Sequence, residues 1–476
     1  MPEIPRSLSI SSFLALATAM VAALLGGCGF GSGGSGKTLI SNQVTPANPS
    51  VAVGQMQQFK VIGMFNDGSM ADVTNAATWD SSQPAVAMIT ITGLASAMAL
   101  GRPQIIATVL TGGNPLVGST TLIIVGARAA GPSRYAYVAN LTSNNISAFT
   151  INAASGALGV VAGSPFAAGA EPFSVAVDPA GKFVYAANTN SGNISGYAIT
   201  QASGALSAAP GSPFAAGSGV AGLATDASGR FLYAANFFSF TVSGYSIDPS
   251  TGALAPMPQG PFAAGREPVA VAVDPAGQYV FVADQGQGCT PAGTCGVCVY
   301  TMDATSGALT QISGSPFAAG PEPSGIAVDP SGQFVYVANQ TTNTTFEFSI
   351  FPSTGALTQI GATTPPAMGG GISVAVEPSG RFAYVTDGFN NNIGAYSIDA
   401  ASGVLTAIAG SPFGAGTDPS SVAVDASGKF LYVANQGGGV SAYTINSASG
   451  ALTPVNAAPF AAGTAPISVI TAPPGQ

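Results

Sequence analysis

The stretch PFSVAVDPAGKFVYAANTNSGNISGYAITQASGALSAAPGSPF, residues 172–214, decides the fold of this 476-residue chain. It holds four short runs of small, β-branched and aromatic residues, at 172–178, 182–188, 193–200 and 205–214. Turn formers such as Asp-Pro-Ala-Gly separate the runs, which is typical of short strands joined by tight turns. The stretch therefore predicts a unit of four consecutive strands.

The second run of this unit recurs seven times along the chain. The copies begin at Arg134, Lys182, Arg230, Gln278, Gln333, Arg381 and Lys429. Their spacing is 48 residues except between Gln278 and Gln333, where an insertion makes it 55. Four strands in a repeat of this length predict the blades of a seven-bladed β-propeller.

The two ends of the repeat region predict how the ring closes. The region begins with a second run at Arg134 and ends with a first run, PISVIT, at 466–471. These two incomplete units match only if the C-terminal strand completes the N-terminal blade. Such closure leaves no open sheet edge.

The segment before the repeats predicts a separate β-sandwich. Residues 38–127 contain short alternating strands, an Asn-Asp-Gly turn at 66–68 and the only tryptophan, Trp79, which we expect in the sandwich core. A linker at 128–133 leads into the propeller at 134–476. The predicted fold class is therefore all-β, an immunoglobulin-like sandwich followed by a propeller.

The N-terminus predicts export. Residues 1–27 contain Arg6, then a short apolar run, and end at Leu25-Gly26-Gly27 before Cys28, as in a secretory signal peptide. The segment Leu25-Gly26-Gly27-Cys28 resembles the bacterial lipobox, which implies a lipid on Cys28 and membrane attachment through it. The Gly/Ser-rich residues 28–37 then form a flexible tether. By the same resemblance, Gly29 favours the outer membrane or cell surface.

Composition removes several function classes. The chain has no histidine, which excludes Ser-His-Asp and Cys-His catalysis and histidine-ligated metals. Only 11 Lys and Arg residues are present and the net charge is −9, so we expect no nucleic-acid partner. No residue pattern calls for a metal or a cofactor.

The repeat motifs DPxGxFVYVAN, ISxYxI and SGALTxxxGSPF, found across residues 134–470, resemble the YVTN-type propellers of the seven-bladed lactonase family. That family includes 6-phosphogluconolactonase and carboxymuconate cycloisomerases. The sandwich segment resembles group 2 bacterial immunoglobulin-like domains. The first resemblance implies lactone hydrolysis or cycloisomerisation. In the family, a histidine often follows the proline that opens the first strand, but here that position holds Phe173, Val269, Ser324 and Ser420.

Most charged residues of the repeats are interpreted as structural. The acids that follow each first strand have the sequence of a turn, D-[PA]-[AS]-G, and the basic residues before each second strand would be solvated. The loops between the fourth and first strands remain, and propeller topology places them on one face, the top face. The candidate ligand-binding residues there are Glu171, Arg266, Glu267, Glu322 and Asp418. Arg266 and Glu267 are the catalytic candidates, matched loosely to the family's arginine and glutamate.

The insertion holds three cysteines, Cys289, Cys295 and Cys298. In an exported protein they favour one disulfide and one remaining thiol. The spacing does not choose the pair.

Two functions follow from these observations. The first is a binding module that a stalk presents to a glycan, a small acid or lactone, a peptide or a protein. The alternative is a lactone hydrolase or cycloisomerase that works outside the cytoplasm with a histidine-free site.

Overall fold

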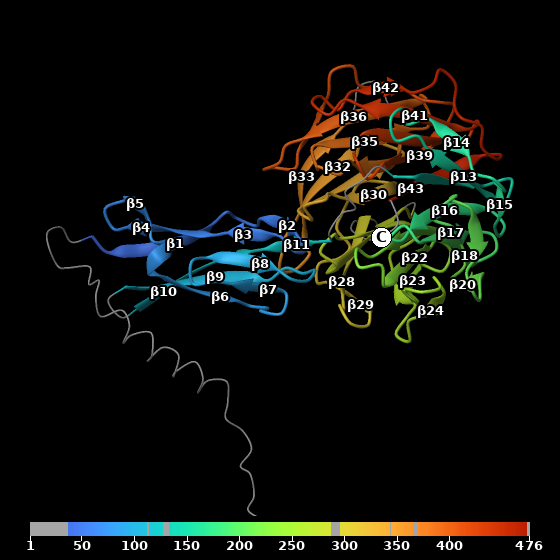
Figure 1. Ribbon diagram of the computed structural model, residues 1–476. Helices are drawn as coiled ribbons and strands as arrows, with labels where there is room; N and C mark the ends of the chain where they lie inside the picture. Colours follow the sequence, from blue (N-terminus) through green and yellow to red (C-terminus); the bar gives the residue numbers. More distant parts are fainter. Residues whose placement is uncertain are drawn as a thin grey trace, which may run out of the picture.

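The computed structural model describes residues 37–111, 114–126, 133–286, 296–342, 344–364 and 370–473. An elongated β-sandwich abuts a closed ring of β-sheets (Figure 1). Nearly all regular structure is strand, which confirms the predicted all-β class. The described ranges contain no helix long and apolar enough to cross a bilayer. The predicted signal peptide, most of the tether and Cys28 lie outside them.

The sandwich is made of short strands and one 3₁₀ helix. They are β1 (Leu39–Thr45), β2 (Ser50–Ala52), β3 (Met56–Gln58), β4 (Lys60–Phe65), β5 (Met70–Asp72), η1 (Thr74–Ala76), β6 (Ala77–Ser81), β7 (Ala87–Ile89), β8 (Leu94–Ala97), β9 (Gln104–Thr111), β10 (Asn114–Thr121) and β11 (Ile123–Val125). Its sheets have the orders β1-β4-β5, β10-β9-β6, β11-β2 and β3-β8-β7. Phe59 and Val61 lie at the centre of the core, whereas Trp79 is half-buried at its margin.

The propeller consists of seven antiparallel sheets, which we call blades 1 to 7. The strands nearest the axis are, from blade 1 onward, β43 (Pro466–Ala472), β16 (Pro172–Val177), β21 (Val220–Thr225), β26 (Pro268–Val273), β30 (Pro323–Val328), β34 (Gly371–Val376) and β39 (Pro419–Val424). The second strands are β12 (Tyr135–Asn140), β17 (Phe183–Asn188), β22 (Phe231–Asn236), β27 (Tyr279–Asp284), β31 (Phe334–Asn339), β35 (Phe382–Asp387) and β40 (Phe430–Asn435).

The outer half of each blade completes the four-stranded pattern. The third strands are β13 (Asn145–Ile151), β18 (Asn193–Ile199), β23 (Thr241–Ile247), β28 (Gly296–Met302), β32 (Thr345–Ile350), β36 (Asn392–Ile398) and β41 (Val440–Ile445). The fourth are β14 (Leu158–Val160), β19 (Leu206–Ala208), β24 (Leu254–Pro256), β29 (Leu309–Gln311), β33 (Leu357–Thr363), β37 (Leu405–Ala407) and β42 (Leu452–Pro454). Four two-residue strands, β15 (Phe166–Ala167), β20 (Phe214–Ala215), β25 (Phe262–Ala263) and β38 (Phe413–Gly414), pair with third strands.

Blade 1 combines the two ends of the repeat region. β43 pairs antiparallel with β12, with Val138 opposite Val469. The predicted closure by the C-terminal strand is confirmed.

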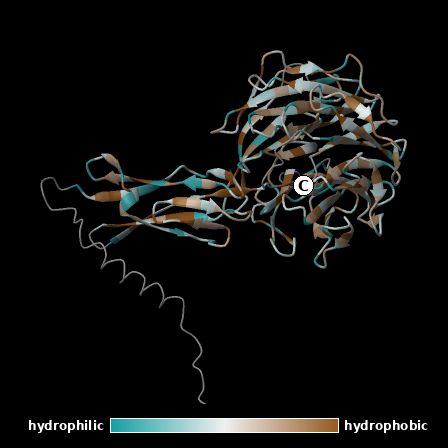
Figure 2. Cartoon of the chain, viewed as in Figure 1, coloured by the Kyte–Doolittle hydropathy of each residue, from teal (hydrophilic) through white to brown (hydrophobic). Residues whose placement is uncertain are grey.

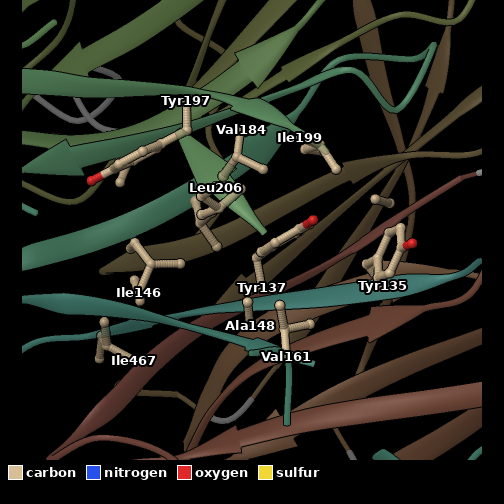
Figure 3. Close-up of a cluster of buried hydrophobic side chains, with 14 residues drawn as sticks. Tyr135, Tyr137, Ile146, Ala148, Val161, Val184, Tyr197, Ile199, Leu206 and Ile467 are labelled. Carbon is tan, nitrogen blue, oxygen red and sulfur yellow. The ribbon is translucent and has the colours of Figure 1, made fainter. Parts of the chain in front are cut away.

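The apolar core lies between neighbouring blades. Tyr137 and Ile146 of blade 1 pack with Val184 and Leu206 of blade 2 (Figure 3). Because blades stack face to face, a strand with apolar residues on both sides is buried on both sides, and all second strands are fully buried.

The tyrosine of the YVAN-type motif also links neighbouring blades. It hydrogen-bonds to a residue 66 or more positions away in the sequence. In six blades its hydroxyl donates to a glycine carbonyl in the outer turn of the next blade. The pairs are Tyr137–Gly204, Tyr185–Gly252, Tyr233–Gly307, Tyr336–Gly403, Tyr384–Gly450 and Tyr432–Gly156. The motif is therefore a scaffold feature, and its recurrence says little about chemistry.

The acids after the first strands cap turns on the bottom face, as predicted. In blade 2, the Asp178 carboxylate accepts the backbone N–H groups of Ala180, Lys182 and Phe183. Asp274 of blade 4 departs from this pattern. Its Oδ1 accepts the Gln278 N–H, but its Oδ2 accepts Nε and Nη2 of Arg102 from the sandwich, at 3.1 and 2.5 Å.

The ion pair between Arg102 and Asp274 fixes the sandwich to the bottom face of the propeller. The two side chains are 1% and 0% exposed. Arg102 Nη2 also donates to the Gly332 carbonyl at 2.7 Å, and Gly126 N–H donates to Pro275 O at 3.1 Å. The top face therefore lies on the side of the ring away from this joint.

Candidate functional site

The four predicted acids of the top face occupy one structural position in four blades. Glu171, Glu267, Glu322 and Asp418 each precede the proline that opens an innermost strand, with φ between 53° and 56°. Ala465 and Gly219 have the same left-handed backbone in blades 1 and 3. Since alanine and glycine adopt the same backbone at this position, the turn itself does not require an acid.

The surroundings of these corners are polar and partly open. Glu322 accepts a hydrogen bond from the Thr341 hydroxyl. The backbone N–H groups of Glu171 and Asp418 donate to Asn144 and Asn391 side chains at 2.8 and 2.7 Å. Partial burial raises the pKa of Asp418.

Arg266 is exposed beside Glu267 at the corner of blade 4. Within the described ranges the ion pairs are Lys37–Asp67, Lys60–Asp72 and Arg102–Asp274, so Arg266 is not within ion-pair distance of the four acids. The structure places the predicted residues on one face but does not join them into one charged cluster.

Two blades without a corner acid carry exposed phenylalanines instead. Phe238 of blade 3 lies against Gly219 and is 64% exposed, and Phe389 of blade 6 lies against Gly370 and is 66% exposed. Phe240 adds a third ring in blade 3, 41% exposed. Our sequence reasoning missed this face of the site. The signal was present, because FFSF at 237–240 and GFN at 388–390 replace polar loops of the other repeats.

The wall of the central channel has no acid–base group. None of the seven innermost strands contains Asp, Glu, Lys, Arg, Cys or Tyr. At two of the positions where the family often has histidine, the serine hydroxyls are bound to backbone. Ser324 Oγ donates to Gly371 O at 2.7 Å, and Ser420 Oγ contacts Ile467 O at 2.9 Å. Figure 2 likewise shows hydrophilic colour scattered over the propeller rather than gathered.

Blade 4 contains an unusual buried pair beneath its top-face loop. Four blades join an asparagine at the end of the second strand to a third-strand serine, as in Asn188 Nδ2 to Ser195 Oγ at 2.9 Å. Blade 4 has Asp284 and Cys298 at these positions. Both carboxylate oxygens of Asp284 are buried, and neither has a hydrogen bond of normal geometry.

The electrostatics of this pair follow from its burial. Desolvation raises the pKa of Asp284 to about 7, opposed in part by the nearby Cys298 thiol and backbone N–H groups. Burial likewise raises the pKa of the Cys298 thiol.

The structure tests the prediction of one disulfide and one free thiol only at Cys298. Its thiol is free and buried, so a disulfide that includes Cys298 is not formed in this structure. Cys289 and Cys295 lie outside the described residues, and their pairing stays a prediction. No group of three or more His, Cys, Asp or Glu that suits a metal ion occurs in the described parts of the chain.

The fold and its top face define a seven-bladed β-propeller carried on an immunoglobulin-like sandwich. The model of the lactonase seven-bladed β-propeller family matches residues 128–221, 206–313, 256–375 and 363–470. The chain belongs to this family, as its repeat motifs predicted. The group 2 bacterial immunoglobulin-like domain matches residues 40–118.

Solved structures share the propeller fold at low sequence identity. The periplasmic gluconolactonase of Pseudomonas aeruginosa is 21% identical with a TM-score of 0.59, covering 71% of this chain and 98% of that one. A Bacteroides fragilis protein provisionally assigned as a 6-phosphogluconolactonase is 20% identical with a TM-score of 0.61, covering 71% and 97%.

A curated relative matches a much smaller part. Ice-binding protein 1 of Shewanella frigidimarina (strain NCIMB 400) is 41% identical over 93 residues, which is 19% of this chain. The chain spans 10% of the length of that relative.

Proposed function

We propose that this chain is an exported, lipid-anchored binding protein whose propeller binds a carbohydrate at its top face. The observation that carries the proposal is the distribution of acidic and aromatic side chains around that face. Four blades present a corner acid, two present exposed phenylalanine rings, and the channel wall below them has no acid–base group. Exposed apolar patches bordered by polar groups mark interaction sites.

Carbohydrate is the ligand class that fits both kinds of group. Carboxylates accept hydrogen bonds from sugar hydroxyls, and aromatic rings cover the apolar face of a sugar ring. A phosphorylated or otherwise strongly anionic ligand fits poorly, since the chain has net charge −9 and Arg266 is the one basic residue of the corner loops.

A glycan array with the mature protein tests this proposal. We expect binding that a double variant, Phe238→Ala with Phe389→Ala, reduces at least tenfold. Phe351→Ala is the matched control, because Phe351 is 58% exposed but lies in a bottom-face turn. Equal loss in the control and the double variant would argue against the top face, and no glycan bound at all would refute the ligand class.

The second candidate function is lactone hydrolysis, and family membership favours it. Without histidine, a corner carboxylate such as Glu267 would have to act as the general base toward water, with Arg266 stabilising the charge on the lactone oxygen. The test is turnover of a panel of lactones. Turnover that Arg266→Ala abolishes would displace the pure binding proposal, whereas no turnover on any lactone would remove the enzyme proposal.

Membrane attachment through Cys28 is part of the proposal and has its own test. Labelled palmitate should enter the wild-type chain during expression and should not enter Cys28→Ala. Equal labelling of both chains would refute the anchor. The lipobox resemblance at Leu25-Gly26-Gly27-Cys28 supports it.

A further inference from the structure

A cavity lies at the joint between the two domains, on the opposite side of the ring from the top face. Its volume is about 340 Å³, and residues of both domains line it. Gln83, Arg102 and Gln104 come from the sandwich, and Gln278, Tyr279 and Met302 come from blade 4. A volume of this size is within the range of small-molecule sites.

The lining is polar but carries no net charge. Arg102 is the one basic residue that lines the cavity, and Asp274 neutralises it through the buried ion pair. The other polar groups are amides and hydroxyls, which both donate and accept hydrogen bonds. Tyr279, Met302 and Pro352 add apolar surface. An uncharged ligand rich in hydroxyls matches this combination better than an ion does.

Hydrogen-bonding capacity remains unused around this cavity. Among the described residues, Gln83 and Gln278 have no side-chain hydrogen bond, and they approach the cavity from different domains. Arg102 Nη1 is buried without an acceptor, although Nε and Nη2 are paired. The Arg102 side chain is 1% exposed, so the two glutamines supply the hydrogen-bonding groups that a ligand in the cavity can reach.

We propose that this interdomain cavity binds a small neutral polyol, of the size of a monosaccharide or disaccharide, through Gln83 and Gln278. The site is separate from the top face and does not depend on the function proposed for it. Because the ligand contacts both domains, its binding strengthens the joint.

Calorimetric titration of the full-length protein with glucose, N-acetylglucosamine and maltose tests the proposal, with gluconate as the charged comparison. We expect at least one neutral sugar to bind more tightly than gluconate. Gln83→Ala and Gln278→Ala should each weaken its binding about fivefold, as the loss of one hydrogen bond does. The two substitutions lie in different domains, so misfolding of one domain would not explain both results.

Two controls separate this site from the rest of the molecule. Gln333→Ala changes the residue equivalent to Gln278 in blade 5, which does not line the cavity, and should leave binding unchanged. The Phe238→Ala and Phe389→Ala double variant should also leave it unchanged. No binding by any of the three neutral sugars would overturn the proposal, as would binding whose affinity Gln278→Ala leaves unchanged or binding that disappears with the top-face variant.

Discussion

At the scale of single residues, the carboxyl group of Asp284 has the most testable behaviour. It replaces the asparagine of five other blades, is 0% exposed and has no hydrogen bond of normal geometry to either oxygen. The titratable groups beside it are Cys298 and Tyr300, and burial raises the pKa of both above their ordinary values. No cation offsets its charge in the described surroundings. Ionisation of Asp284 is therefore unfavourable in the folded protein.

Stability should fall as the pH rises from about 4 to about 7. The pKa of Asp284 is about 7 in the folded chain, against its ordinary value of 3.8. Between these values the unfolded chain releases its proton first, which favours unfolding. The full effect is on the order of 4 kcal/mol. Asp284→Asn should remove this loss, so thermal unfolding at pH 8 should shift upward while that at pH 4 changes little.

Asp387→Asn in blade 6 is the matched control for this experiment. Asp387 occupies the same position, but its carboxylate accepts the N–H groups of Gly370, Phe389 and Asn390. A neutral amide would lose part of that bonding, so the control variant should not gain stability at pH 8. An equal gain in both variants would contradict the explanation.

At the scale of strands, the repeat pattern predicted nearly everything that local chemistry decides. Runs of apolar residues with turn formers between them predicted the strands, and the two incomplete units predicted the closure by β43. The partner of Asp274 could not be predicted in this way. Asp274 has the same turn sequence as its counterparts, yet it pairs with Arg102, 172 residues away. Only the packing of one domain on the other creates that contact. The exposed phenylalanines and the Asp284–Cys298 pair were visible as departures from the repeat, but a departure alone does not show its surroundings.

Removal of β43 should open the ring and destabilise it. β43 buries Ile467 and Val469, and burial of two such side chains is worth about 3–6 kcal/mol. Truncation after Thr464 would also expose the edge of β12 to pairing with other chains. We expect a lower melting temperature and larger species in size-exclusion chromatography. A chain that ends at Pro473 keeps β43 and serves as the control, and identical behaviour of both truncations would contradict the closure argument.

At the scale of the whole molecule, the buried ion pair decides how the top face is presented. A flexible link would let the propeller swing on the sandwich, whereas the Arg102–Asp274 pair holds its bottom face against the sandwich. The Arg102 guanidinium also lies 5.4 Å from the centre of the Tyr279 ring. The face that carries the acids and phenylalanines therefore points away from the stalk in a fixed direction.

Loss of Arg102 should release the two domains from each other without unfolding either one. Removal of one partner from a buried pair costs about 3–5 kcal/mol, because the other charge stays buried and unpaired. For Arg102→Ala we expect a broader distribution of dimensions in small-angle X-ray scattering and a separate, lower melting transition.

Lys60→Ala is the control, since its pair with Asp72 is exposed, at 3.6 Å, and such pairs contribute about 0–1 kcal/mol. Arg102→Met combined with Asp274→Asn removes both charges and should restore much of the attachment. If the double variant were as loose as Arg102→Ala, the unpaired charge would not be the cause, and if Arg102→Ala scattered like the wild type, the ion pair would not hold the joint.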